Sequence, residues 1–268
     1  MTVAFLKICC CRKGYLCPLT ASLPEPARAA RILCDRRAGA GADGLLVFPD
    51  HVGGEKELVC YSPAGEQVPA AREAVLAGAK FLYDTARVNL TELCLTESGN
   101  SHRLRLETCG GRAWGVTVDF GYPLLDAGKW AVGLSGLVRE APYHLGQDKY
   151  LLTVVGFETP VAVLSRGEHP PRELAPLLAC FPHGVSAVYL PDAGTALTPL
   201  PLHSIPDEDS AAIASAVVTA AAIAGRIDFG EPHPVAIGGI RYHVTVTPAL
   251  RLFVTFDVTE ALRGEIEL

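Results

Sequence analysis

The segment CDRRAGAGADGLLV, residues 34–47, is the most specific stretch of the chain and decides its fold. Gly39, Gly41 and Gly44 suit a turn that needs unusual backbone angles or a close approach to another segment. Asp43 is expected to bond the amides of its own turn, and the apolar run after it is typical of a buried strand. A phosphate-binding loop is the alternative, but the Gly-Lys-Ser/Thr ending is absent and a strand, not a helix, follows.

The length and charge of the chain bound its class. It has 268 residues, 49% of them hydrophobic and 19% charged, which is enough to bury two cores, so we expect two domains. Asp and Glu outnumber Lys and Arg, 29 to 23, which argues against a partner nucleic acid. The apolar run at residues 1–7 is too short for a signal peptide, so none is expected, and the longest apolar run, residues 210–225, falls short of the roughly 18 residues that span a bilayer. We therefore expect a cytoplasmic protein with no membrane partner.

The nine cysteines do not form the evenly spaced framework of a small secreted domain, because their number is odd and three are adjacent, at positions 9–11. We expect reduced thiols. A metal site is not expected, because adjacent residues on a strand point to opposite faces and the spacing fits no zinc pattern. Five cysteines are expected to act as small buried hydrophobes: Cys34, Cys60, Cys94, Cys109 and Cys180.

The pattern of apolar residues predicts many short strands and two long helices. The helices are expected at residues 69–83, with Pro69 in the first turn, and at 207–223, where three acids suit the positive end of the helix dipole. Shorter helices are expected at 25–34 and 172–181. Strands are expected at residues 2–8, 44–48, 57–61, 93–95, 102–107, 114–120, 150–155, 187–189, 242–247 and 252–258.

The order of these elements suggests a repeated half. Each long helix follows a strand-rich block of similar length. Small residues cover almost all of the second helix, so strands can approach it from every side. The pattern favours a central helix wrapped by strands, made twice.

The segment 34–47 closely resembles a signature of diaminopimelate epimerases, and the likeness is collinear over nearly the whole chain. It continues in FLK at 5–7, YSPAG at 61–65, VTVDFGYP at 116–123, FPHGV at 181–185, and GG at 238–239 with the final strand region. The resemblance implies an α+β fold of two pseudo-symmetric domains, each a β-barrel around a central helix. It places the halves at 1–115 and 116–250, with 251–268 returning to the first half.

The resemblance also shows what is missing. Enzymes of this family need no cofactor and use two cysteines, one at the start of each central helix, as base and acid. The first position corresponds to Ala71, and the second lies at or next to Ala212. An alanine cannot exchange a proton, so epimerisation by two cysteines is not expected here.

Other groups are therefore expected to carry the proton. Glu208 with His203 is the best remaining proton-transfer pair, and Lys13, which replaces a ligand-binding amide of the family, could bind an anion or a carbonyl oxygen. Each has a plainer interpretation: Asp207, Glu208 and Asp209 could cap the helix, and Lys13 could be a solvated loop residue.

Six further residues are expected to line the substrate pocket. Arg72 and Glu73 stand at the start of the first long helix, where an exposed pair or capping is the alternative. Ser62 and Ser186 replace asparagines of the family, and Cys9 replaces a histidine, with Lys13 near enough to lower its pKa. Asp207 completes the set.

Three functions remain open at this stage. The first is a cofactor-independent isomerase or cyclase acting on a small molecule of specialised metabolism, since a related isomerase of phenazine biosynthesis shares the fold and uses carboxylates. The second is a non-catalytic pseudoenzyme that binds a ligand or a protein, and the third is an amino-acid epimerase with relocated acid and base. A small-molecule substrate and a homodimer are expected.

Overall fold

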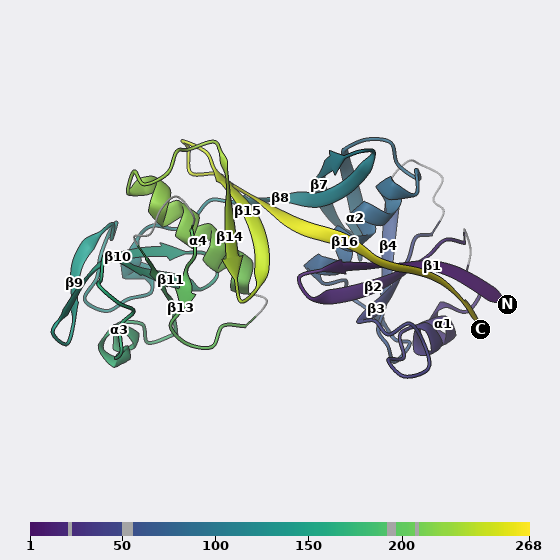
Figure 1. Cartoon of the computed structure of the whole chain (residues 1–268), viewed down its shortest axis with the longest axis horizontal. Helices are drawn as coiled ribbons and strands as arrows, with labels where there is room; N and C mark the ends of the chain where they lie inside the picture. Colours follow the sequence, from purple (N-terminus) through teal and green to yellow (C-terminus); the bar gives the residue numbers. More distant parts are fainter. Residues whose placement is uncertain (21–22, 50–55, 192–196, 207–208) are drawn as a thin grey trace. The chain divides into compact units, whose positions relative to one another are not determined.

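The computed structural model describes residues 1–20, 23–49, 56–191, 197–206 and 209–268. The chain divides into two compact units (Figure 1). The first unit contains Met1–Val118 and Thr255–Leu268, and the second contains Asp119–Val254. The sequence placed the corresponding boundaries at 115/116 and 250/251.

Eight strands of the first unit close into a barrel, because the last strand pairs back with the first. The order is β1, β2, β3, β4, β6, β7, β8 and β16, and the short β5 pairs with β4. The bounds are Thr2–Cys10 (β1), Lys13–Pro18 (β2), Gly44–Val47 (β3), Lys56–Tyr61 (β4), Gln67–Val68 (β5), Glu92–Glu97 (β6), Asn100–Cys109 (β7), Arg112–Gly121 (β8) and Leu252–Glu267 (β16).

Helix α2, Arg72–Asp84, runs through the middle of this barrel and contacts six of its strands. Every residue from 74 to 82 is buried, Lys80 included, so the helix is enclosed on all sides. Helix α1, Pro26–Leu33, contacts β3 and β4 and buries Leu33 against Leu45 and their apolar neighbours.

The second unit is also built around one helix. Helix α4, Ser210–Ile223, is buried at every residue except Ala212 and Ile223. It contacts β10 and β11 of a five-stranded sheet, and β14 and β15 of a hairpin. The bounds are Ala141–Leu145 (β9), Asp148–Gly156 (β10), Pro160–Ser165 (β11), Ser186–Leu190 (β12), Leu200–Pro201 (β13), Pro232–Ile237 (β14), Ile240–Val246 (β15), Ala127–Lys129 (η1) and Ala175–Ala179 (α3).

The predicted fold class is confirmed, because each unit wraps strands around a central helix. All four predicted helices are present, and the strands that the sequence did not predict are β2, β5, β9, β11, β13 and β14. Helix α2 begins three residues after the expected Pro69. The reason lies in two contacts outside the helix: β5 pairs with β4 up to Val68, and the Ala70 amide donates to the buried Glu97 carboxylate of β6 at 3.0 Å. None of the described helices has the length and apolarity needed to cross a membrane.

The loop at residues 35–43 explains why the decisive segment is rich in glycine. A Cβ at Gly39 would lie 2.1 Å from the carbonyl oxygen of Ile32, and Gly41 has φ +67°. The sequence suggested that Asp43 bonds the amides of its own turn, but its carboxylate accepts instead from the Arg36 side chain and from the Gly14 amide, each at 2.7 Å, and its own amide donates to the Gly14 carbonyl at 2.7 Å. Asp35 bonds the turn amides instead. The loop is thereby fixed to the start of β2.

Replacing Gly39 with alanine is expected to lower the free energy of unfolding by about 3 kcal/mol, the upper end of the cost of overpacking, because a backbone carbonyl cannot rotate away from the new methyl group. Gly110→Ala is the control: its φ is +59° but nothing lies within 4 Å, so only backbone strain of about 1–2 kcal/mol is expected. Urea unfolding of both variants measures the difference. An equal cost in the two variants would contradict the close packing of the loop on α1.

All nine cysteines lie in the described part and are free thiols. Cys34 and Cys60 are buried as expected, whereas Cys94 and Cys109 are exposed, because they lie on outward positions of β6 and at the end of β7. Burial raises the pKa of Cys60 to about 11.

This shift predicts a loss of stability at alkaline pH. The Cys60 thiol of the unfolded chain deprotonates from about pH 9, while the folded chain holds its proton up to pH 11, so stability falls as the pH rises between these values. We expect Cys60 to account for about 2–3 kcal/mol of that fall. Urea unfolding at pH 8 and pH 11 should show a shallower pH dependence for Cys60→Ala than for the wild type. Cys94→Ala, at an exposed thiol, should leave the pH dependence unchanged.

Candidate functional site

The structure brings two of the predicted site residues together at the start of α2. Lys13 Nζ lies 3.4 Å from Glu73 Oε2. The Lys13 side chain is 44% exposed and that of Glu73 is 14% exposed, so a half-buried carboxylate is paired with an ammonium group that is open to solvent. The two residues are 60 positions apart, and the barrel makes them neighbours.

The hairpin between β1 and β2 positions Lys13. Cys10 pairs with Lys13 across the hairpin, and Cys11 and Arg12 form its two-residue turn. The next residue, Gly14, is held by two bonds to Asp43. The decisive segment of the sequence therefore fixes the strand that carries the ammonium group.

The segment before α2 positions Glu73. Ala71 is the N-cap residue, with ψ 158°, and makes no side-chain capping bond. The bond from the Ala70 amide to Glu97 fixes the entry to the helix. Glu73 then falls in the first turn, where a carboxylate is favoured by the helix dipole. Sequence reasoning missed Glu97, since its partner is a backbone amide 27 positions away.

The groups around Glu73 are weak acids. The pKa of Cys10 is raised well above its ordinary value by a hydrogen bond with Cys11 and by burial, with a further contribution from Glu73. Burial, and then the Glu73 carboxylate, raise the pKa of Tyr15 above its ordinary value. A thiol and a phenol that keep their protons therefore flank the Lys13–Glu73 pair. Sequence reasoning missed Cys10 and Tyr15: on β1 the alternation of buried Ile8 and Cys10 with half-buried Cys9 was an available signal, whereas β2 is buried from Gly14 to Pro18 and offers no alternation.

Cys9 lies on the opposite face of β1 from Cys10 and feels the charge of a different lysine, Lys7. A Cβ at Gly14 would lie 3.4 Å from Cys9 Sγ and 2.9 Å from Lys7 Cε. Burial raises the pKa of Cys9, and Lys7, not Lys13, opposes the rise. The expectation that Lys13 lowers this pKa is wrong, because successive residues of a strand face opposite sides and Lys13 pairs with Cys10, not Cys9.

Arg72 and Ser62 are not brought to the Lys13–Glu73 pair by any described contact. The Arg72 guanidinium lies over the Phe256 ring of β16, 5.9 Å from its centroid. Ser62 closes the turn after β4: its amide donates to the Glu66 carbonyl at 2.8 Å, and its hydroxyl accepts from the Glu66 amide at 3.3 Å.

His203, in the second unit, uses both ring nitrogens in backbone bonds. Nε2 accepts from the Ala187 amide at 3.0 Å, and Nδ1 donates to the Ser204 carbonyl at 2.9 Å. This assignment makes the ring neutral, because Nε2 must be unprotonated to accept. To act as a base, His203 would have to give up its bond to Ala187.

The other residues expected in the second unit fall into two groups. Ser186 is buried at the start of β12, and Asp209 stands at the N-cap of α4 without a side-chain capping bond, contrary to the capping interpretation. Asp207 and Glu208 lie outside the described residues. The sequence did not predict the buried bond between Ser210 Oγ and the Tyr242 hydroxyl, at 2.5 Å.

A polar depression in the second unit holds none of the predicted residues. It lies between the β9–β10 hairpin and the loop after β11. His169 Nε2 lies 3.8 Å from the Asp148 carboxylate, and the other charged lining residues are Lys149, Arg166 and Glu168. No group of three or more His, Cys, Asp or Glu side chains in the described part is placed to hold a metal ion.

Comparison with known sequences confirms the resemblance to diaminopimelate epimerases. No family model matches the chain. The diaminopimelate epimerase of Moorella thermoacetica is 27% identical over 135 residues, 50% of this chain and 48% of the relative. That of Desulforudis audaxviator is 27% identical over 166 residues, 60% of this chain and 59% of the relative. The chain thus matches between about half and three fifths of the length of these relatives.

Solved structures resemble the whole chain. A putative phenazine biosynthesis PhzC/PhzF protein from Clostridium difficile has a TM-score of 0.59 at 10% identity, covering 99% of this chain and all of that one. A methylitaconate-delta-isomerase has a TM-score of 0.55 at 14% identity, with 99% and 95% covered. A predicted epimerase from Pseudomonas aeruginosa has a TM-score of 0.52 at 16% identity, with 99% of each chain covered. These likenesses establish the fold.

Proposed function

We propose that this chain, which has the fold of the diaminopimelate epimerase-like proteins, is a cofactor-independent isomerase that moves a proton within a small carbonyl or carboxylate compound. The observation that carries the proposal is the half-buried Glu73 carboxylate with the Lys13 ammonium 3.4 Å away. A carboxylate is a base for a carbon acid next to a carbonyl group, and an ammonium stabilises the negative charge that develops on the carbonyl oxygen.

The proposed reaction needs only these two charged groups. Glu73 removes a proton from carbon, the electron pair of the C–H bond moves onto the carbonyl oxygen, and Lys13 binds that oxygen. The protonated Glu73 then returns the proton to a different carbon of the same extended system, and the double bond moves. Tyr15 and Cys10, which keep their protons, restrict water around the carboxylate without competing as bases.

The number of bases bears on the type of isomerisation. Inversion at one carbon needs a base and an acid on opposite faces, whereas a proton shift between two carbons on one face needs a single group. The two helices that carry cysteines in diaminopimelate epimerases contain none here: α2 begins after Ala71, and α4 holds Ala212. We therefore favour a proton shift over epimerisation. Glu208 remains the prediction for a second group, and specialised metabolism and a homodimer also remain predictions.

Proton exchange with solvent tests this function directly. The protein is incubated in D2O with a panel of small unsaturated acids and keto acids, and ¹H NMR follows the loss of C–H signals. Exchange at a carbon next to a carbonyl, faster than in buffer, is the expected result. Amino acids with an α-hydrogen, diaminopimelate included, form a second panel: exchange there alone would establish the amino-acid epimerase instead.

A non-catalytic binding protein is the second candidate, and the geometry of His203 favours it. A catalytic site keeps its base available, yet both nitrogens of this ring are used in backbone bonds. Under this alternative, compounds of the panel would raise the melting temperature of the protein without any exchange of their hydrogens.

A further inference from the structure

Two adjacent cysteines at the β1–β2 turn, Cys10 and Cys11, transfer no proton in the proposed reaction. Cys10 Sγ lies 3.8 Å from Cys11 Sγ, and the two thiols are joined by a hydrogen bond. Cys10 is 2% exposed, and Cys11 is of intermediate exposure. Cys11 is therefore the more accessible of the two thiols, and the buried Cys10 thiol lies next to it.

The arrangement is specific to this pair. Cys9, Cys10 and Cys11 are consecutive, but along β1 successive side chains alternate between the two faces, so Cys9 lies on the other face, paired with Gly14 and under the charge of Lys7. The chain reverses at Cys11, where φ is +48°, and this reversal brings its sulfur to the side of Cys10.

The turn that holds the pair is strained. Cys11 and Arg12 both have positive φ, at 48° and 65°, where two-residue hairpin turns usually carry Asn and Gly. Side chains with a Cβ adopt this conformation at a cost, and such outliers persist where the surrounding structure holds them. The β1–β2 pairing supplies that support here.

We propose that Cys10 and Cys11 are a reversible oxidation site, at which a hydroperoxide converts the two neighbouring thiols into a disulfide between adjacent residues. The peroxide oxidises the accessible Cys11 thiol to a sulfenic acid and is reduced to an alcohol or water. The Cys10 sulfur then attacks the Cys11 sulfur: the S–S bond forms, the S–O bond of the sulfenic acid breaks, and the departing hydroxyl takes the Cys10 proton and leaves as water. A thiol reductant restores both thiols.

The product is expected to be easily reduced. Adjacent Cα atoms are about 3.8 Å apart, shorter than the roughly 4.4–6.8 Å usual across a disulfide. Strained disulfides of this kind are the labile, regulatory ones. The sulfurs must also approach from 3.8 Å to about 2.05 Å, which requires the Cys11–Arg12 turn to change.

The change would reach the Lys13–Glu73 pair, because Lys13 directly follows this turn and pairs with Cys10. The effect on turnover rests on the proposed function. The formation of the disulfide does not, so the two are measured separately.

Mass spectrometry of the intact, folded protein after treatment with one equivalent of hydrogen peroxide tests the site. Trypsin cuts after Lys7 and Arg12, so all three cysteines fall in one peptide, residues 8–12. We expect that peptide to lose the mass of two hydrogen atoms and to retain one thiol that can be alkylated, at Cys9. Dithiothreitol should restore three alkylatable thiols.

Three single variants locate the bond. Cys9→Ser should form the disulfide as the wild type does, whereas Cys10→Ser and Cys11→Ser should form at least about tenfold less of it. The proposal would be overturned if the peptide of Cys10→Ser still lost two hydrogen atoms. It would also be overturned if neither the wild type nor Cys9→Ser lost them. If oxidation proceeds as expected and proton exchange is unaltered, the site stands and its link to Lys13 fails.

Discussion

Glu73→Gln is expected to lower the rate of proton exchange by about 10²- to 10⁴-fold, the range that a positioned general base contributes. The reason is that the amide cannot accept a proton from carbon, although it has nearly the shape of the carboxylate and still accepts a hydrogen bond from Lys13. The rate is followed by ¹H NMR in D2O on the compound that shows exchange with the wild type.

Two comparisons separate chemistry from folding. The Lys13–Glu73 pair is partly exposed, and such a pair contributes at most about 1 kcal/mol to stability, so the variant should unfold at nearly the wild-type urea concentration. Glu66→Gln, at an exposed acid of the same unit, should exchange at the wild-type rate. If Glu73→Gln retains more than about a tenth of the wild-type rate, Glu73 is not the base.

Lys13→Met tests the other half of the pair. We expect the exchange rate to fall by about 10- to 100-fold, less than for Glu73→Gln, because the carboxylate remains but the charge that stabilises the carbonyl oxygen is lost. Lys13→Arg keeps a positive charge and should recover part of the rate. If Lys13→Met and Lys13→Arg lost the same part of the exchange rate, Lys13 would act through its shape or its contacts in the fold instead of its charge.

The central helices could be predicted from the sequence because their signals are local. Runs of Ala and Leu, small residues and acidic first turns identify segments 69–83 and 207–223 in isolation. The start of α2 could not be placed, since the bond that delays it joins Ala70 to a carboxylate on β6. Element boundaries set by a distant partner are invisible to local patterns.

At the candidate site, too, the sequence predicted residues but not the contacts that they make in the fold. The resemblance to a family identified Lys13 and Glu73 as pocket residues, but not their contact, which depends on the closed barrel. It also selected His203, whose two ring bonds depend on the backbone of β12. Residue types alone do not show whether a titratable group is available.

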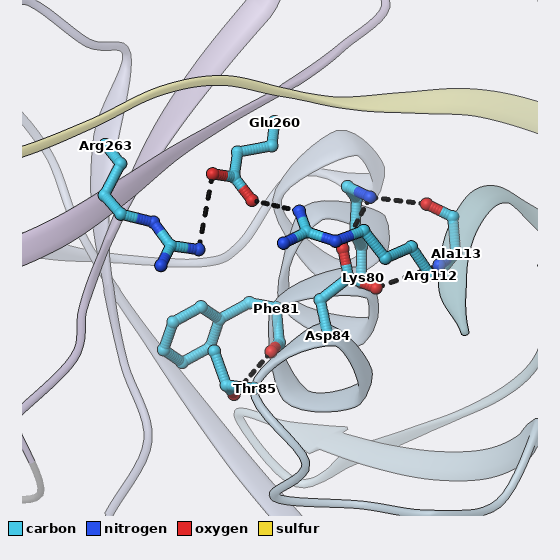
Figure 2. Close-up of polar contacts among 8 residues, drawn as sticks. All are labelled: Lys80, Phe81, Asp84, Thr85, Arg112, Ala113, Glu260 and Arg263. Carbon is cyan, nitrogen blue, oxygen red and sulfur yellow. Dashed lines mark hydrogen bonds and ion pairs between the residues drawn. The ribbon is translucent and has the colours of Figure 1, made fainter. Parts of the chain in front are cut away.

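One buried ion pair could have been foreseen. A helix enclosed on all sides must bury Lys80, and Asp84 stands one turn later, within reach of its ammonium group. Lys80 Nζ lies 2.7 Å from Asp84 Oδ2, and their side chains are 5% and 3% exposed (Figure 2). The sequence analysis treated this helix only as a carrier of its N-terminal residues.

The Lys80–Asp84 pair also bonds the backbone of β8 in the barrel. The β7–β8 pairing shifts register between Glu107 and Thr108, just opposite the start of β8. There the Ala113 amide donates to Asp84 Oδ1 at 2.9 Å, and Lys80 Nζ donates to the Ala113 carbonyl (Figure 2). Each charge is therefore satisfied twice, once by the other and once by the backbone of β8.

Asp84→Ala is accordingly expected to lower the free energy of unfolding by about 3–5 kcal/mol, because it leaves the Lys80 charge buried without its counter-charge. Lys80→Met should lower the free energy of unfolding by a similar amount, because it leaves the Asp84 charge buried without its counter-charge. The double variant Lys80→Met/Asp84→Leu removes both charges together and leaves only the two Ala113 backbone groups without partners, at about 1–3 kcal/mol each. Its cost should therefore be at least about 2 kcal/mol less than the sum of the single costs.

Urea unfolding of the four proteins at neutral pH gives this double-mutant cycle, and melting temperatures serve where a single variant is too unstable for a complete curve. Arg112→Ala is the control, since its ion pair with Glu260 lies beside the buried pair but on the exposed side of the barrel, 60% exposed at the guanidinium side chain (Figure 2). That variant should lose no more than about 1 kcal/mol. Additive costs for Lys80→Met and Asp84→Ala, or costs as small as that of Arg112→Ala, would contradict the burial of this pair and with it the enclosure of α2 within the barrel.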